Sequence, residues 1–108
     1  MANAAIVRYH TTHDSADDNQ RLIEDLLAEL AAWDPGGLLV QVLRFDDGAG
    51  FMHVAVFDGT ADAFAPCAAY RAFHQDLGHR LAAPPTVMRA TMIGAYSARR
   101  PCAWRDGR

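Results

Sequence analysis

The spacing of apolar and polar residues predicts a strand and then a long helix in the N-terminal part of the chain. Residues 4–10 (Ala-Ala-Ile-Val-Arg-Tyr-His) are rich in β-branched and aromatic side chains, which favour a strand. A helix should begin at Ser15, or one residue earlier, because a Ser side chain can cap free backbone N–H groups. Residues 34–37 (Asp-Pro-Gly-Gly) should end it. Its apolar positions recur every three or four residues and predict a stripe that faces a core: Leu22, Ile23, Leu26, Leu27, Leu30 and Trp33.

The middle of the chain predicts a β-hairpin that is apolar on both faces. Two apolar runs, residues 38–45 and 51–57, flank a loop rich in Asp and Gly, which tolerate the backbone conformations of tight turns. The strongly polar residues of the two runs are Gln41, Arg44 and His53. A sheet with one face in water should instead alternate apolar and polar residues. We therefore expect both faces of this hairpin to be covered.

The remaining elements complete a βαββαβ order. A second helix should run from Pro66, a residue suited to a first helical turn, to about Ala82, and a last strand should span residues 86–96. This order predicts an α+β, ferredoxin-like fold with a four-stranded antiparallel sheet and both helices on one face. Residues 1–96 would form this single domain, and residues 97–108 a basic tail. In the second helix we expect four residues to be buried: Tyr70, Phe73, Leu77 and Leu81.

The uncovered face of this sheet would be too apolar for water, so a second copy of the chain is the simplest cover. The sequence thus predicts a homodimer.

Composition narrows the function classes. The formal net charge of the 108 residues is −3, and the Arg residues gather disproportionately in the tail, so the domain is acidic. An acidic body argues against a nucleic-acid partner, because phosphate binding requires a basic face. The chain has no apolar run long enough to cross a membrane and no secretion signal, so we expect a cytoplasmic protein. Cys67 and Cys102 cannot make a disulfide framework. Abundant Ala and Arg with no Lys are typical of a GC-rich bacterial genome.

Three features together resemble the antibiotic-biosynthesis-monooxygenase family of dimeric α+β barrels. They are the βαββαβ order, an Ala- and aromatic-rich helix with His74 and, five residues later, His79, and a Gly-containing hairpin that leads into residues 51–55 (Phe-Met-His-Val-Ala). The resemblance covers residues 4–96. It implies a ligand cleft between sheet and helices, and activities such as cofactor-independent oxidation of polyketide aromatics, quinol oxidation or haem breakdown.

The chain departs from two patterns within the family. Haem-degrading members combine a first-strand Asn, a Trp that opens the second helix and a His further along it, and only the His is matched here, by His74. Aromatic-oxidising members often carry a Trp on the third strand, and residues 51–57 contain none. Haem binding through His74 is therefore kept as an alternative to a reaction without a cofactor.

His53 is the first candidate for chemistry. If Phe45 opposes Phe51 across the hairpin, His53 shares a face with Gln41 and Phe57, and His53 and Gln41 form a polar pair in an apolar lining. Burial would shift the pKa of His53, which could then act as a base near neutral pH. The alternative is a His that is satisfied by a backbone or dimer contact.

Three further residues could assist His53. Asn19 heads the apolar stripe of the first helix, where its amide could polarise a carbonyl, unless it is a solvated first-turn residue. Arg44 could bind an anionic group, or it could cap a sheet edge or form an ion pair across a dimer. Tyr70 could stack on a substrate or belong to the core.

A metal site is not expected. His74 and His79 lie about 140° apart around a helix and cannot share one ion as an i, i+4 pair could. The first hypothesis is a cofactor-independent monooxygenase, or a related isomerase or cyclase, in which His53 takes a proton from a small aromatic or quinone-like metabolite and Asn19 and Arg44 stabilise the anion. His74, Gln41, Tyr70 and Phe57 would line its pocket. The rival is a non-catalytic dimeric binding or interaction module.

Overall fold

The structure, a computed structural model, describes residues 3–34, 36–58 and 68–96, with side chains from residue 72 onward in the last range. The predicted start of the second helix at Pro66, both cysteines and the basic tail lie outside the described residues. The elements in chain order are β1 (Asn3–His10), η1 (His13–Ser15), α1 (Ala16–Trp33), β2 (Leu38–Arg44), β3 (Gly50–Phe57), α2 (Ala68–Gln75), α3 (Leu77–Arg80) and β4 (Thr86–Thr91).

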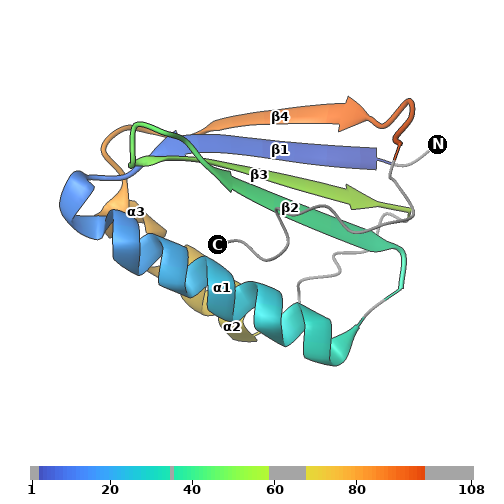
Figure 1. The fold of residues 1–108 in the computed structure, drawn as a ribbon, viewed down its shortest axis with the longest axis horizontal. Helices are drawn as coiled ribbons and strands as arrows, with labels where there is room; N and C mark the ends of the chain where they lie inside the picture. Colours follow the sequence, from blue (N-terminus) through green and yellow to red (C-terminus); the bar gives the residue numbers. More distant parts are fainter. Residues whose placement is uncertain (1–2, 35, 59–67, 97–108) are drawn as a thin grey trace.

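The four strands form one antiparallel sheet in the order β2-β3-β1-β4. The helices lie together on one side of it, and the other side is open in the described part of the chain (Figure 1). The predicted α+β, ferredoxin-like fold is confirmed. The two central strands, β1 and β3, pair on both sides, so a side chain on them is held by neighbours in two directions.

The helix α1 begins at Ala16, one residue after the predicted start, and ends at Trp33, directly before the residues that were predicted to end it. The Ser15 side chain makes no capping hydrogen bond, because the 3-10 turn η1 leads directly into the helix. At the other end Asp34 adopts a left-handed conformation (φ 52°), and its N–H donates to the Leu30 carbonyl. The predicted burial of Trp33 is wrong, since this side chain is 45% exposed. Leu27, Leu38 and Val40 pack on the cluster of Leu26 and Leu30, and Trp33 does not belong to it.

The second helix and the last strand are shorter than predicted. Asp76 separates α2 from α3, consistent with the poor helix propensity of Asp and of the nearby Gly78. The last strand, β4, ends at Thr91 rather than residue 96, because Thr91 pairs with Asn3, the first residue of β1, and no described residue of β1 lies beyond it.

The hairpin register also corrects the sequence prediction. Phe51 pairs with Arg44, not with Phe45, and His53 pairs with Val42. A shift of one residue exchanges the two faces of a strand. His53 and Phe57 therefore face the helices, as do Val40 and Val42, whereas Gln41 lies on the open face and is exposed.

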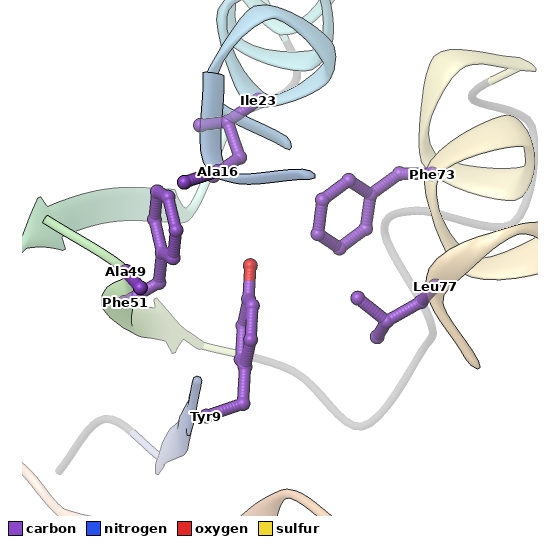
Figure 2. Close-up of a cluster of buried hydrophobic side chains, with 7 residues drawn as sticks. All are labelled: Tyr9, Ala16, Ile23, Ala49, Phe51, Phe73 and Leu77. Atoms are coloured by element: carbon purple, nitrogen blue, oxygen red, sulfur yellow. The ribbon is translucent and has the colours of Figure 1, made fainter. Parts of the chain in front are cut away.

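The core lies between the sheet and the helices. Figure 2 shows its centre, where the Tyr9 ring rises from the sheet and points its hydroxyl group toward the helices. Tyr9 stacks on Phe51 with ring centroids 5.6 Å apart, and Phe73 and Leu77 close the cluster from α2 and α3. This cluster places a phenol hydroxyl group, polar and reactive in principle, in the middle of the apolar layer.

Candidate functional site

An apolar cavity of about 130 Å³ lies between the sheet and the helices, next to this core. Three of its lining residues, His53, His74 and Tyr9, carry polar groups, and the other lining residues are apolar. Ligand pockets usually have this composition, with a few polar groups in an apolar lining. The lining residues are Ala5, Val7, Tyr9, Leu26, Val40, His53, Ala55, Phe73, His74 and Leu77.

His53 is held on β3 between Val7 of β1 and Val42 of β2. Its ring centroid lies 5.2 Å from that of Tyr9 and 5.4 Å from that of Phe73. Burial among these groups, with the nearby His74 as a second cause, lowers the pKa of His53 to about 4. At pH 7 His53 is therefore a neutral imidazole.

A chain of hydrogen bonds runs from His53 into the protein. His53 Nε2 lies 2.7 Å from the Tyr9 hydroxyl, and Asn19 Nδ2 donates to the same hydroxyl at 2.9 Å. Arg80 Nε donates to Asn19 Oδ1, also at 2.9 Å. Burial raises the pKa of Tyr9 to about 12, although the Asn19 hydrogen bond and the charge of Arg80 act against it. Tyr9 therefore keeps its proton at neutral pH.

Arg80 is the functional residue that the sequence did not reveal. It is 4% exposed, stands over the Phe73 ring at 4.9 Å, and donates through Nη2 to the Phe73 carbonyl at 3.1 Å. Asp76 is its nearest carboxylate, 3.6 Å from Nη1. The available signal was the spacing of Phe73, Leu77 and Arg80, which continues one helical stripe. An Arg in such a stripe is usually read as solvent-exposed.

The structure brings some of the predicted residues together. His53 and His74 both line the cavity, and partial burial, followed by the charge of Arg80, lowers the pKa of His74. Asn19 is fully buried and is linked to His53 through two hydrogen bonds, by way of the Tyr9 hydroxyl. The Asn19 amide thus points toward the end of β1, as expected from its place at the head of the helix stripe.

The other predicted residues lie elsewhere. Arg44 is at the edge strand, where its guanidinium group donates to the Gly48 carbonyl, Asp17 and Gln20. Gln41 is on the opposite face of the sheet from His53, so the predicted pairing of these two side chains is wrong. Phe57 shares the face of His53 but is not among the residues that line the cavity. The side chain of Tyr70 lies outside the described residues.

Among residues 3–34, 36–58 and 68–96, no group of three or more His, Cys, Asp or Glu side chains is placed to hold a metal ion. No helix in the same ranges is long and apolar enough to cross a membrane.

Comparison with known proteins identifies the fold. No protein-family model and no curated protein matches the sequence. Among solved structures, Rv0793 from Mycobacterium tuberculosis superposes with a TM-score of 0.73 and 16% identity, over 90% of this chain and all of that one. A Caulobacter crescentus protein gives 0.71 and 16%, over 86% and 91% of the two chains. A Bacteroides thetaiotaomicron protein gives 0.76 and 8%, over 92% and 96%.

The last two of these proteins are provisionally named antibiotic biosynthesis monooxygenases. At such low identity the likeness speaks for the fold. The chain therefore has the three-dimensional fold of structures given that family name, as the resemblance in sequence predicted.

Proposed function

We propose that the protein is a cofactor-independent, monooxygenase-like enzyme that acts on a small aromatic or quinone-like molecule in the cavity between sheet and helices. The single observation that carries this proposal is the apolar cavity of about 130 Å³ with a neutral His53 in its wall. An interaction module would have no need of such a cavity, which favours an enzyme or a ligand-binding protein over an interaction module.

The volume of the cavity limits the ligand. A dry cavity of about 150 Å³ is known to hold a benzene molecule. A cavity of about 130 Å³ therefore matches roughly one ring, or the terminal ring of a larger aromatic. The aromatic rings of Tyr9 and Phe73 in its wall would contact the flat face or edge of that ring.

The proposed reaction needs only molecular oxygen as a co-reactant. An aromatic with an acidic ring CH₂ group loses a proton to water to give an enolate-like anion, whose charge lies largely on oxygen, and this proton is recovered in the water molecule that the reaction forms. The anion then gives electrons to O₂, one oxygen atom is kept as a new ring carbonyl, and the other leaves as water. The CH₂ carbon loses four electrons in total and O₂ gains four, so no external reductant is required. A polar group at the anionic oxygen, here His53, would lower the barrier.

Replacement of His53 tests this proposal. We expect His53→Ala to lower the rate of oxygen uptake with a panel of anthrones and quinols by about 100-fold or more, because a donor at a developing oxyanion contributes that much. An oxygen electrode would measure the rates. His13→Ala, which removes an exposed histidine outside the cavity lining, is the matched control and should leave the rate unchanged.

Two results would contradict the proposal. An undiminished rate in His53→Ala would remove this residue from the mechanism. No oxygen uptake with any compound of the panel would argue against an oxygenase.

The same proposal includes a homodimer through the open face of the sheet. Large apolar side chains remain exposed there, namely Leu39 (47%), Leu43 (53%) and Met88 (45%). Three such residues across one sheet face form the kind of apolar surface that a twofold partner covers.

A charge placed on this face should separate the subunits. We expect Leu43→Arg to weaken the dimer by about 100-fold or more, because twofold symmetry introduces the change twice in one interface. Light scattering during gel filtration would show the mass falling from twice 11.8 kDa to that value. Ala28→Arg, on an exposed position of α1, should leave the dimer intact. A folded wild-type monomer in dilute solution would overturn the dimer proposal.

Haem binding through His74 fits the cavity less well. A space that matches one small ring cannot take a porphyrin unless the helices move away from the sheet, so the reaction without a cofactor remains the proposal.

A further inference from the structure

The hydrogen-bond chain behind His53 has a fixed direction, which starts at Arg80. A guanidinium group carries only donors and no acceptor. Arg80 Nε lies 2.9 Å from the amide oxygen of Asn19, so this oxygen must be the atom that faces Arg80. The amide nitrogen of Asn19 is then turned toward Tyr9, 2.9 Å away. Arg80 therefore fixes the orientation of the Asn19 amide, with the oxygen toward Arg80 and the nitrogen toward Tyr9.

The direction of the hydrogen bonds continues from Asn19 through Tyr9 to His53. The Asn19 amide donates to the Tyr9 oxygen, so the proton of the Tyr9 hydroxyl is available for the 2.7 Å contact with His53 Nε2. Nε2 accepts this hydrogen bond. A neutral imidazole carries one proton, and with Nε2 acting as acceptor that proton must be on Nδ1.

Burial makes the opposite direction costly. If Nε2 of His53 donated to Tyr9, the hydroxyl proton of Tyr9 would have to find another acceptor inside the core. Tyr9 is 3% exposed, and both Asn19 and Arg80 are buried, so water has no ready access to these groups. A buried donor left without a partner is unfavourable. A single tautomer should therefore dominate.

We propose that Arg80 is a positioning residue that acts through Asn19 and Tyr9 to fix His53 as an Nδ1–H donor for a ligand in the cavity. His53 lines the cavity and its Nε2 is engaged by Tyr9, so Nδ1 is the nitrogen that remains for a ligand. The preferred ligand carries a ring oxygen that accepts a hydrogen bond, either a carbonyl or an already ionised hydroxyl. This ligand class rests on the proposed function, whereas the tautomer does not.

In this tautomer His53 would act as a hydrogen-bond donor rather than as a base. With its one lone pair directed at Tyr9, His53 has no free lone pair with which to take a proton from a substrate. It would instead hold a ring oxygen and favour negative charge on it, as an oxyanion-stabilising donor does.

Asn19→Asp is the decisive variant. A carboxylate accepts from Arg80 and also from Tyr9, so the Tyr9 oxygen would then accept from His53, and the imidazole proton would move to Nε2. Two-bond ¹H–¹⁵N correlation spectra of the labelled protein at pH 7 distinguish the two tautomers. We expect Nδ1–H in the wild type and Nε2–H in Asn19→Asp. Asp76→Asn changes the charge next to Arg80 without reversing a hydrogen bond, and should keep Nδ1–H.

The spectrum of the wild type alone can overturn the proposal, whether or not the variant folds. An Nε2–H tautomer in the wild type would contradict the direction of the chain. An unchanged tautomer in folded Asn19→Asp would show that Asn19 and Arg80 do not set it.

A second measurement tests the ligand class. Tropone has one compact ring with a carbonyl that only accepts, and cycloheptatriene is nearly the same ring without the oxygen. Followed by shifts of the His53 ring signals, tropone should bind the wild type at least about 10-fold more tightly, and Asn19→Asp should lose this preference. If the tautomers are as expected but neither ring binds, the proposed function of the cavity is contradicted and the role of Arg80 stands. Equal binding of both rings to the wild type would contradict the ligand class.

Discussion

Acidification from pH 7 to pH 4 is expected to lower the free energy of unfolding by about 3 kcal/mol through His53 alone. Burial holds the pKa of this imidazole at about 4 in the folded protein, against an ordinary value of 6.5. Between these two values the unfolded chain binds a proton that the folded protein does not, so stability falls as the pH falls. Each pH unit of this window contributes about 1.4 kcal/mol. Above pH 6.5 the imidazole of His53 is largely neutral in both the folded and the unfolded state, so this residue no longer lowers the free energy of unfolding.

Urea unfolding at pH 7, 5.5 and 4 would measure this loss, and His53→Gln is the matched control. The Gln amide oxygen can accept the hydrogen bond of Tyr9 but does not titrate, so most of the pH dependence in this window should vanish. A smaller slope should remain because the pKa of His74 is also lowered in the folded protein. Asp47 titrates below this window, because hydrogen bonds from the Ala49 and Gly50 amides and from His10 hold its pKa at about 2. Identical slopes in the two proteins would exclude His53 as the source.

Asn19→Leu is expected to lower the free energy of unfolding by about 4 kcal/mol, within the range found when one partner of a buried charged group is removed. The variant keeps the number and branching of the side-chain heavy atoms but takes away the acceptor of Arg80 Nε and the donor to Tyr9. Arg80 would remain buried with the Phe73 carbonyl 3.1 Å from Nη2, and with Asp76, whose side chain is 66% exposed, as a carboxylate 3.6 Å from Nη1. Urea denaturation at pH 7 measures the change.

The double variant Asn19→Leu/Arg80→Met separates a lost interaction from a stranded charge. Replacement of a buried polar pair by apolar residues of similar volume is often close to neutral. We therefore expect the double variant to recover most of the stability that Asn19→Leu loses, which a double-mutant cycle would show as a strong coupling. Additive losses in the two single variants would mean that Asn19 and Arg80 do not act as one unit.

The fold could be predicted because its signals are local and repeated. Ile23, Leu26 and Leu30 recur with the period of a helix, and all three are buried in the structure. The order of strands and helices, together with the apolar hairpin, then leaves few arrangements. The prediction of the fold therefore did not depend on the exact position of any single residue.

The candidate site was harder to predict because it depends on register and on distant contacts. Moving the pairing of Phe51 from Phe45 to Arg44 changes the residue opposite His53 from Leu43 to Val42 and places Gln41 on the other face of the sheet, although the strands themselves stay the same. Arg80 reaches Asn19 across 61 positions of the chain. Local periodicity says nothing about such a contact, and the general rule that Arg is exposed points the other way.

The bonded series from Arg80 to His53 also ties four segments of the protein together, since its members come from α3, α1, β1 and β3. These hydrogen bonds oppose sliding of the helices over the sheet, because such a movement would break several of them at once in a buried interior. The cavity should therefore keep nearly the same shape with and without a bound ligand. Selection among candidate molecules would then depend on how well the ring that enters fits a rigid cavity.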